Sequence, residues 1–226
     1  SVTNALSNTT SYQYDAAGRL KKVIYPDTTF VQYTYDLAGR GTKITDPRGN
    51  DTNFVYDGAY RLTSVTDALN HTTSYAYDLM SNLTSITDAL SRVTNFEYDD
   101  FNRLKKTIYP PASAGATRLQ ETITYNTVGE VTKRTDTAGR DTTYVYDTAN
   151  RLTSTTDPAL QVTQFQYNAR SQPITITDAL SQQYTFVYDA LGRVTQATRG
   201  GTSMSYSYDA VGNQTQRTDH NGASIT

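Results

Sequence analysis

A tyrosine followed by Asp or Asn recurs ten times along this 226-residue chain at an almost constant spacing. The intervals between successive tyrosines are 21, 21, 21, 21, 27, 21, 21, 21 and 20 residues. A fixed period of this length indicates a repeat architecture, in which each repeat covers its hydrophobic face only by stacking on its neighbours. The ten repeat tyrosines are Tyr14, Tyr35, Tyr56, Tyr77, Tyr98, Tyr125, Tyr146, Tyr167, Tyr188 and Tyr208.

Each period predicts two strands and two turns. Residues 72–77 alternate and are rich in Thr and Tyr, which favours a strand, and residues 83–87 form a second β-rich run. The segments between them, residues 78–82 and 88–91, have the composition of turns. We therefore predict an all-β fold, a repetitive antiparallel β-hairpin meander of about 20 short strands with a 21-residue period.

The residue two positions before the repeat tyrosine is aromatic in nine of the ten repeats. Successive side chains of a strand point to opposite faces, so this aromatic and the repeat tyrosine share one face. We expect a ladder of rings that acts as buried cement between the strands, and we expect the opposite face to be the wetter one. The residues at this position are Tyr12, Tyr33, Phe54, Tyr75, Phe96, Ile123, Tyr144, Phe165, Phe186 and Tyr206.

The turn after the tyrosine follows a pattern with a physical basis. Its first Asp can accept backbone N–H groups two residues on, and seven repeats carry Gly or Asn, which tolerate positive φ, four residues after the tyrosine. Arg follows in six repeats, which predicts an ion pair with the turn Asp worth about 0–1 kcal/mol if exposed. The predicted structural signature comprises Tyr14, Asp15, Gly18, Arg19, Tyr35, Asp36, Gly39, Arg40, Tyr56, Asp57, Tyr77, Asp78, Tyr98, Asp99, Tyr125, Tyr146, Asp147, Tyr167, Tyr188, Asp189, Gly192, Arg193, Tyr208 and Asp209.

Composition argues against several functional classes. The net charge of −2 gives no basic face for nucleic acid, and a mean hydropathy of −0.61 without a long apolar run gives no reason to expect membrane insertion. Without cysteine there is no thiol nucleophile, and His71 and His220 are too far apart in the repeats to support a Ser-His-Asp triad or a histidine-rich metal site. We predict a protein that is not an enzyme, with no cofactor and no metal.

Two binding alternatives stay open. Asp46, Asn50 and Asp51 are close enough in sequence to offer oxygen ligands to calcium, although their spacing fits no EF-hand loop. Rows of tyrosine beside Asp, Asn and Gln could also stack on sugar rings.

The motif Tyr-Asp-x-x-Gly-Arg, complete at residues 14–19, 35–40 and 188–193, resembles the YD-repeat or RHS-repeat family. This family includes Rhs and wall-associated polymorphic toxins, the B and C components of insecticidal toxin complexes, and teneurins. The resemblance implies a spiralling or curved sheet that forms part of a hollow β-shell, which in the bacterial toxins encloses a C-terminal effector. Bacterial shells of this family typically end in an Asp-Pro-containing motif that is linked to self-cleavage. The two Asp-Pro pairs of this chain, Asp46-Pro47 and Asp157-Pro158, lie inside ordinary repeat turns, so the resemblance does not imply self-cleavage here.

The repeats define the expected domain organisation. We expect residues 1–226 to form a single array of ten repeats, cut within a repeat at both ends and carrying a turn insertion at residues 109–118. The expected partners are neighbouring repeats of a longer chain, or copies of the chain joined through open strand edges, and an encapsulated effector.

The expected function is that of a non-catalytic structural segment of a shell in a larger secreted bacterial protein. The alternatives are an extracellular carbohydrate-binding or cell-adhesion module and a self-associating filament. The expected location is secreted or at the cell surface, with no signal peptide within this segment.

Overall fold

A computed structural model describes residues 1–225, which fall into two compact units, residues 1–120 and residues 121 onward. Each unit is built from short strands alone. The strands of the first unit are β1 (Val2–Thr3), β2 (Thr9–Tyr14), β3 (Leu20–Ile24), β4 (Phe30–Tyr35), β5 (Gly41–Thr45), β6 (Asp51–Tyr56), β7 (Leu62–Thr66), β8 (Thr72–Tyr77), β9 (Leu83–Thr87), β10 (Val93–Tyr98) and β11 (Leu104–Ile108).

The second unit continues the same alternation of six-residue and five-residue strands. Its strands are β12 (Gln120–Tyr125, of which the first residue still belongs to the first unit), β13 (Val131–Thr135), β14 (Asp141–Tyr146), β15 (Leu152–Thr156), β16 (Val162–Tyr167), β17 (Pro173–Thr177), β18 (Gln183–Tyr188), β19 (Val194–Arg199), β20 (Thr202–Tyr208), β21 (Gln214–Thr218) and β22 (Ser224–Ile225).

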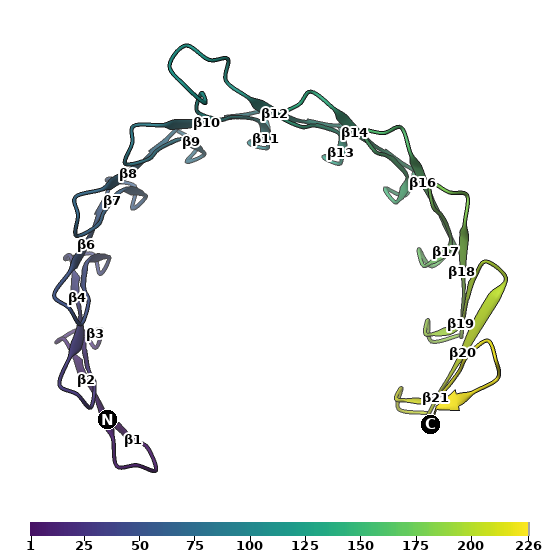
Figure 1. Ribbon diagram of the computed structural model, residues 1–226, viewed down its shortest axis with the longest axis horizontal. Helices are drawn as coiled ribbons and strands as arrows, with labels where there is room; N and C mark the ends of the chain where they lie inside the picture. Colours follow the sequence, from purple (N-terminus) through teal and green to yellow (C-terminus); the bar gives the residue numbers. More distant parts are fainter. Residues whose placement is uncertain (226) are drawn as a thin grey trace. The chain divides into compact units, whose positions relative to one another are not determined.

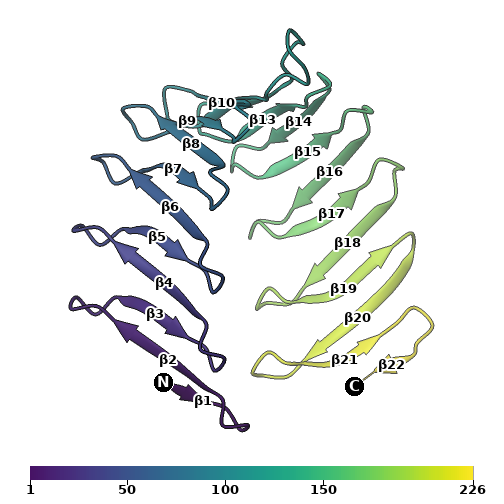
Figure 2. The same ribbon diagram turned by 60° about the vertical axis from the view of Figure 1, so that its left-hand side comes forward.

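Within each unit, consecutive strands lie side by side and pair antiparallel, so the turns alternate between two opposite edges of the sheet (Figures 1 and 2). The prediction of an all-β antiparallel meander is confirmed. The strands predicted over residues 72–77 and 83–87 coincide with β8 and β9.

A β-bulge precedes every repeat tyrosine. In β8 and β9, for example, Ala76 faces Ser85 but Tyr77 faces Leu83, so one residue of β9 is left over. A bulge of this kind accompanies a hairpin loop in which a type I turn is followed by a left-handed residue. The ten bulges therefore come from the turn chemistry of the Tyr-Asp motif.

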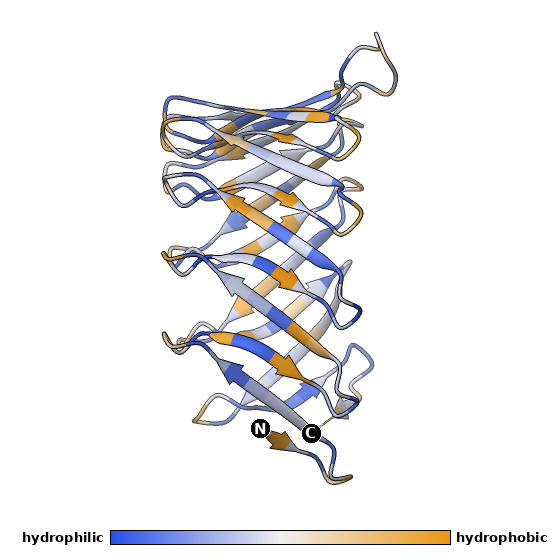
Figure 3. Ribbon diagram, turned by 90° about the vertical axis from the view of Figure 1, so that its left-hand side faces the viewer, coloured by the Kyte–Doolittle hydropathy of each residue, from blue (hydrophilic) through white to orange (hydrophobic). Residues whose placement is uncertain are grey.

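The two faces of the sheet differ in character. The face with the aromatic pairs, which we call the aromatic face, carries Tyr75 and Tyr77 in β8, whereas Ala76 between them is exposed on the polar face. The corresponding residue is exposed in all ten repeats, which confirms that the second face is the wetter one. Short hydrophobic stretches separated by hydrophilic ones mark the strands of the first unit (Figure 3).

The expectation that the ring ladder is buried is wrong. No side chain among residues 1–225 is buried, and of the nine aromatic pairs eight are half-buried and the one in β2 is exposed. The reason is that each unit is one sheet thick. Adjacent strands cover the sides of the rings, but no second layer covers their outer surface.

Positive φ occurs where the turn pattern predicts it. The fourth residue after the tyrosine has positive φ in all ten repeats, including Gly18 at 78° and Asn150 at 60°. Tyr60, Ser81 and Ser171, which the sequence pattern did not single out, adopt the same conformation. The turns at the other edge use it as well, and one of them places Leu160 at φ 62°.

The inserted turn closes with the same bond as its shorter counterpart. The N–H of Tyr25 donates to the carbonyl of Thr29, and the N–H of Tyr109 donates to that of Leu119 across the insertion. The Arg118 guanidinium then fixes the base of the loop, donating to the carbonyls of Tyr109 (2.8 Å), Val93 (2.6 Å) and Ile108 (2.9 Å). This agrees with one turn type in two lengths.

Leu160 offers a test of turn strain. We expect Leu160→Gly to stabilise the chain by about 0.5–1 kcal/mol, because a left-handed conformation costs an L-residue roughly 1–2 kcal/mol and glycine much less. Little packing is lost, since Leu160 is 82% exposed. The measurement is the midpoint of thermal unfolding. Leu90→Gly is the control, because Leu90 is also exposed in a turn but lacks positive φ; stabilisation by both changes would contradict the assignment.

Candidate functional site: the seam between repeats

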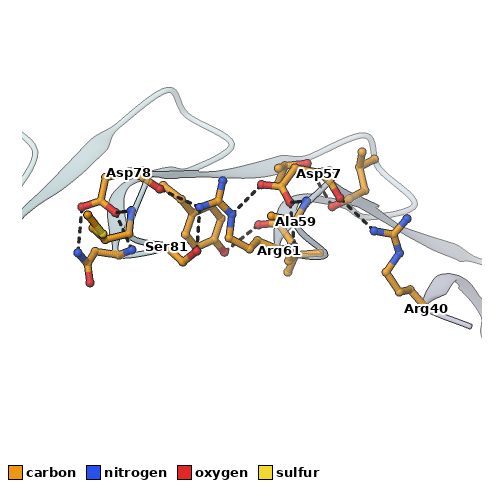
Figure 4. A network of polar contacts seen from close by, with 12 residues as sticks. Arg40, Asp57, Ala59, Arg61, Asp78 and Ser81 are labelled. Carbon is orange, nitrogen blue, oxygen red and sulfur yellow. Dashed lines mark hydrogen bonds and ion pairs between the residues drawn. The ribbon is translucent and has the colours of Figure 1, made fainter. Parts of the chain in front are cut away.

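The turn at Asp57 shows how one side chain organises a five-residue loop. Its Oδ1 accepts the N–H groups of Ala59 (2.8 Å) and Arg61 (3.0 Å), while the N–H of Asp57 donates to the carbonyl of Arg61 (2.9 Å). The N–H of Tyr60 closes the turn on the carbonyl of Asp57 (3.1 Å). One carboxylate oxygen thus holds the backbone of the loop, and the second oxygen bonds a side chain instead (Figure 4).

The second carboxylate oxygen binds the arginine that ends the turn. Nε of Arg61 lies 2.8 Å from Oδ2 of Asp57, and both side chains are about three-quarters covered. The ion pair expected from the sequence is present in all six Asp-Arg turns. The pairs are Asp15 with Arg19, Asp36 with Arg40, Asp57 with Arg61, Asp99 with Arg103, Asp147 with Arg151, and Asp189 with Arg193.

The same arginine reaches the next repeat. Nη1 of Arg61 donates to the carbonyl of Asp78 at 2.8 Å and to the hydroxyl of Ser81 at 3.2 Å (Figure 4). Its guanidinium carbon lies 4.7 Å from the centre of the Tyr77 ring, within the range of a cation–π contact. We call this contact between the Arg of one repeat and the Tyr-Asp of the next the seam. It recurs at Arg19, Arg40, Arg151 and Arg193.

The tyrosine hydroxyl completes the seam from the other side. Oη of Tyr77 donates to the carbonyl of Leu62, the residue after Arg61, at 2.9 Å. The equivalent bonds join Tyr35 to Leu20, Tyr56 to Gly41, Tyr98 to Leu83, Tyr146 to Val131, Tyr167 to Leu152, Tyr188 to Pro173 and Tyr208 to Val194.

This bond explains a difference between the two aromatic positions. The first position is Tyr in five repeats, Phe in four and Ile in one, whereas the repeat position is Tyr ten times. The first position needs only an apolar side chain, usually a ring and once Ile123, whereas the second requires a donor for a carbonyl at the start of a strand. The strict preference for Tyr at the repeat position is visible in the sequence, but our prediction gave both rings the same role. It also gave the arginine a role only in its own turn.

Amides replace arginine in some repeats and form narrower links. Nδ2 of Asn82 donates to Oδ1 of Asn102 at 2.8 Å, and Nε2 of Gln172 donates to the carbonyl of Gly192 at 3.0 Å. Neither side chain carries a charge. The residue that ends the turn therefore links two repeats with a charge in some repeats and without one in others, and Glu130, at the same position, contacts Asn126 of its own turn.

The turn carboxylates are held in the ionised form. The pKa of Asp57 lies below its ordinary value of 3.8, chiefly because its carboxylate accepts the backbone N–H of Arg61 and then the side-chain N–H of the same residue. Asp78 has a lowered pKa with the side-chain amide of Asn82 as the main cause. The repeat tyrosine is the other partner of the seam, and burial raises the pKa of the Tyr188 hydroxyl.

The residues considered for other chemistry are engaged in turns and strands. Asp46 accepts N–H bonds from Arg48 and Asn50, while Asp51 accepts from Thr45 (2.6 Å) and Lys43 (3.0 Å). Within residues 1–225 no group of three or more His, Cys, Asp or Glu side chains is arranged to hold a metal ion. His71 occupies the arginine position of its turn and contacts Asp67 at 3.0 Å.

The part of the chain that the structure describes contains no helix of the length and hydrophobicity needed to cross a membrane.

Comparisons with known proteins agree with this geometry. The family model of the teneurin YD-shell matches residues 50–187, which is more than half of the chain, and the model of the RHS repeat matches residues 1–29 and 17–52. A search of curated protein sequences returned no match.

Solved structures with a similar fold come from toxin complexes. The Photorhabdus luminescens Tc holotoxin pore, which carries a mutation in TccC3, aligns over 93% of this chain with a TM-score of 0.54 and 16% identity. TcdB2-TccC3 without its hypervariable C-terminal region (16% identity) and TcdB2-TccC3-TEV (17%) align over 94% with the same TM-score. At such identities the likeness concerns the fold, and this chain spans only 14% of the length of each matched chain.

The hydroxyl of the repeat tyrosine can be tested directly. We expect Tyr77→Phe to lower the free energy of unfolding by about 1 kcal/mol, because it removes one hydrogen bond and leaves the Leu62 carbonyl without that donor. Tyr75→Phe, in the same strand, is the matched control and should have almost no effect, since Phe occupies this position in four other repeats. Equal losses of stability in chemical denaturation would refute the separate roles of the two rings.

The lowered carboxylate pKa values predict acid sensitivity. Groups whose folded pKa is depressed stabilise the fold at pH values above their unfolded pKa, near 3.8, and this contribution is lost as pH falls through the folded pKa. We expect the thermal midpoint to be flat above about pH 5 and to fall steeply below about pH 4.

Asp57→Asn separates the two functions of the turn residue. The amide oxygen can still accept the backbone N–H groups, as Asn168 does, but the ion pair with Arg61 is lost. We expect the variant to be less stable than the parent at pH 7 and the difference to shrink as the pH falls through the folded pKa of Asp57, which lies below 3.8, because the parent carboxylate is then protonated. A difference in the thermal midpoint that persists unchanged at low pH would count against the ion pair.

Proposed function

Because the chain belongs to the teneurin YD-shell family of repeat proteins, we propose that it is a non-catalytic segment of the wall of a β-shell. Its task is then mechanical, namely to continue a sheet of fixed local geometry from repeat to repeat.

The seam is the observation that carries this proposal. A tyrosine hydroxyl bonds a carbonyl of the previous repeat along most of the chain, and in the repeats whose turn ends in Arg the guanidinium also bonds a carbonyl of the next repeat. The signature residues stabilise the turns and the contacts between neighbouring repeats. This use of the repeated residues favours a structural role in a wall over a catalytic site.

We further propose that the shell encloses a C-terminal toxin or effector of a larger secreted or surface-exposed bacterial protein. The support is the fold shared with TcdB2-TccC3, one form of which is described as lacking a hypervariable C-terminal region. The near-identical turns at residues 66–69 and 87–90 suggest recent duplication, which fits bacterial repeats. The partners would be the adjacent repeats of that longer chain, in which residues 1–226 would form a single array, and the enclosed effector.

A carbohydrate-binding or adhesion module is the second candidate. The observation in its favour is that the rings of the aromatic face are only half-buried, so their outer surfaces are available for stacking on a sugar. A glycan array that gives signal with the parent chain, and loses it when Tyr75 and Tyr144 are replaced by Ser, would support this candidate. A blank array would remove it.

The wall proposal is tested in the full-length polypeptide that contains this segment. Electron microscopy should place the segment in the boundary of a closed volume, and limited proteolysis should leave the enclosed polypeptide intact. Arg61→Ala should speed its digestion, because it opens one seam, whereas Arg48→Ala, at an exposed turn residue, should not. A segment that lies free in solvent on both faces in the full-length protein would refute the proposal.

A further inference from the structure

One hairpin of the second unit breaks the pattern of the turns. β19 and β20 are joined by Gly200 and Gly201 alone, at φ 55° and 81°, whereas the turns before and after it on the same edge span residues 178–182 and 219–223. A two-residue hairpin between two five-residue turns leaves a notch in the edge. The pairing of β18 with β19 extends one step further than in other repeats, to Tyr184 opposite Arg199.

The notch is deepened by a small side chain. Phe186 faces Ala197, which in turn faces Met204. The residue that faces the first aromatic is branched and apolar in several other repeats, namely Val23, Ile44, Val65, Ile86 and Ile176. Ala197 leaves that space open.

The result is a pocket of about 510 Å³ on the second unit, lined among others by Tyr184, Phe186, Ala197 and Met204. This volume lies within the roughly 300–1,000 Å³ typical of small-molecule sites. The two aromatic rings and the thioether of Met204 give the pocket an apolar floor. A floor of this kind can bind the flat hydrophobic part of a ligand.

The charged side chain that lines the pocket is cationic. Arg199 lies at its rim, with Nε and Nη2 donating to Oε1 of Gln182 (3.2 and 3.1 Å) and the guanidinium 5.2 Å from the Tyr184 ring. His220 also lines it, and Nη2 of Arg217 lies 3.7 Å from Sδ of Met204. No Asp or Glu among residues 1–225 pairs with Arg199 or Arg217, and none lines the pocket.

We propose that this pocket binds a small organic anion with a flat apolar body, such as an aromatic carboxylate. The body rests on Tyr184, Phe186 and Met204, and the anionic group meets the guanidinium of Arg199, which has five donors and no carboxylate partner within the described chain. Such a site is independent of the proposed role as a wall.

The two methionines of the chain supply a built-in probe and control. Met204 lines the pocket, whereas Met80 is 72% exposed in a turn of the first unit. With methyl-labelled methionine, titration of 4-phenylbutyrate should shift the Met204 methyl resonance with a dissociation constant on the order of 1 mM and leave that of Met80 unchanged. 4-Phenyl-1-butanol, which has the same body without the charge, should bind about tenfold more weakly.

Two variants assign the interaction to its parts. Arg199→Gln should weaken phenylbutyrate about tenfold and leave the alcohol unaffected. Ala197→Ile should abolish binding of both by filling the floor, and it should fold, because Ile occupies this position in other repeats. Thr155→Ile, at the equivalent position opposite Tyr144, is the matched control and should not change binding.

Several outcomes would overturn the proposal. A Met204 resonance that does not move at 4-phenylbutyrate concentrations on the order of 10 mM would exclude the site, and equal affinity for the acid and the alcohol would exclude recognition of the charge. Preferential binding of maltose at Met204 would replace the anion by a sugar as the ligand. Unchanged binding in Ala197→Ile would show that the ligand lies elsewhere.

Discussion

The hydrogen bond from a tyrosine hydroxyl to a carbonyl at the start of the second strand of the previous hairpin is the interaction on which the rest of this structure depends. A hairpin alone has little to hold it, since two strands are marginal in water. The hydroxyl of Tyr77 and the guanidinium of Arg61 tie two hairpins together at their ends, where the bulge has interrupted the ladder of main-chain bonds. Stability is therefore a property of neighbours, as expected for a quasi-one-dimensional protein.

The absence of buried side chains among residues 1–225 makes this dependence stronger. A two-layered domain draws most of its stability from a covered core, but here each ring is shielded only from the sides. Polar contacts between half-buried side chains therefore contribute a larger share of the stability than they do in a domain with a covered core. The Asp57 to Arg61 pair, with both side chains largely screened from water, is better placed than an ordinary surface ion pair.

Much of this was predictable from the sequence because the determinants are local. Strand bounds at residues 72–77, positive φ at Gly18 and the ion pair of Asp15 with Arg19 all follow from neighbouring residues. The contacts that span 15 to 17 residues, from Tyr35 to Leu20 and from Arg19 to Asp36, were not predicted, because they depend on how one hairpin is set against the next. The burial of the rings was overestimated for a related reason, since a pattern of alternation says which residues share a face but not whether anything covers it.

The bulge beside every repeat tyrosine has a consequence for how such proteins change in size. Each hairpin receives its extra twist from its own five-residue turn and not from contacts with distant parts of the chain. Gain or loss of a whole 21-residue segment would lengthen or shorten the strip without altering the geometry of the hairpins that remain. The number of repeats can thus change during evolution while the geometry of each repeat stays the same. Duplication of a segment would enlarge the sheet without any compensating substitution in the other repeats.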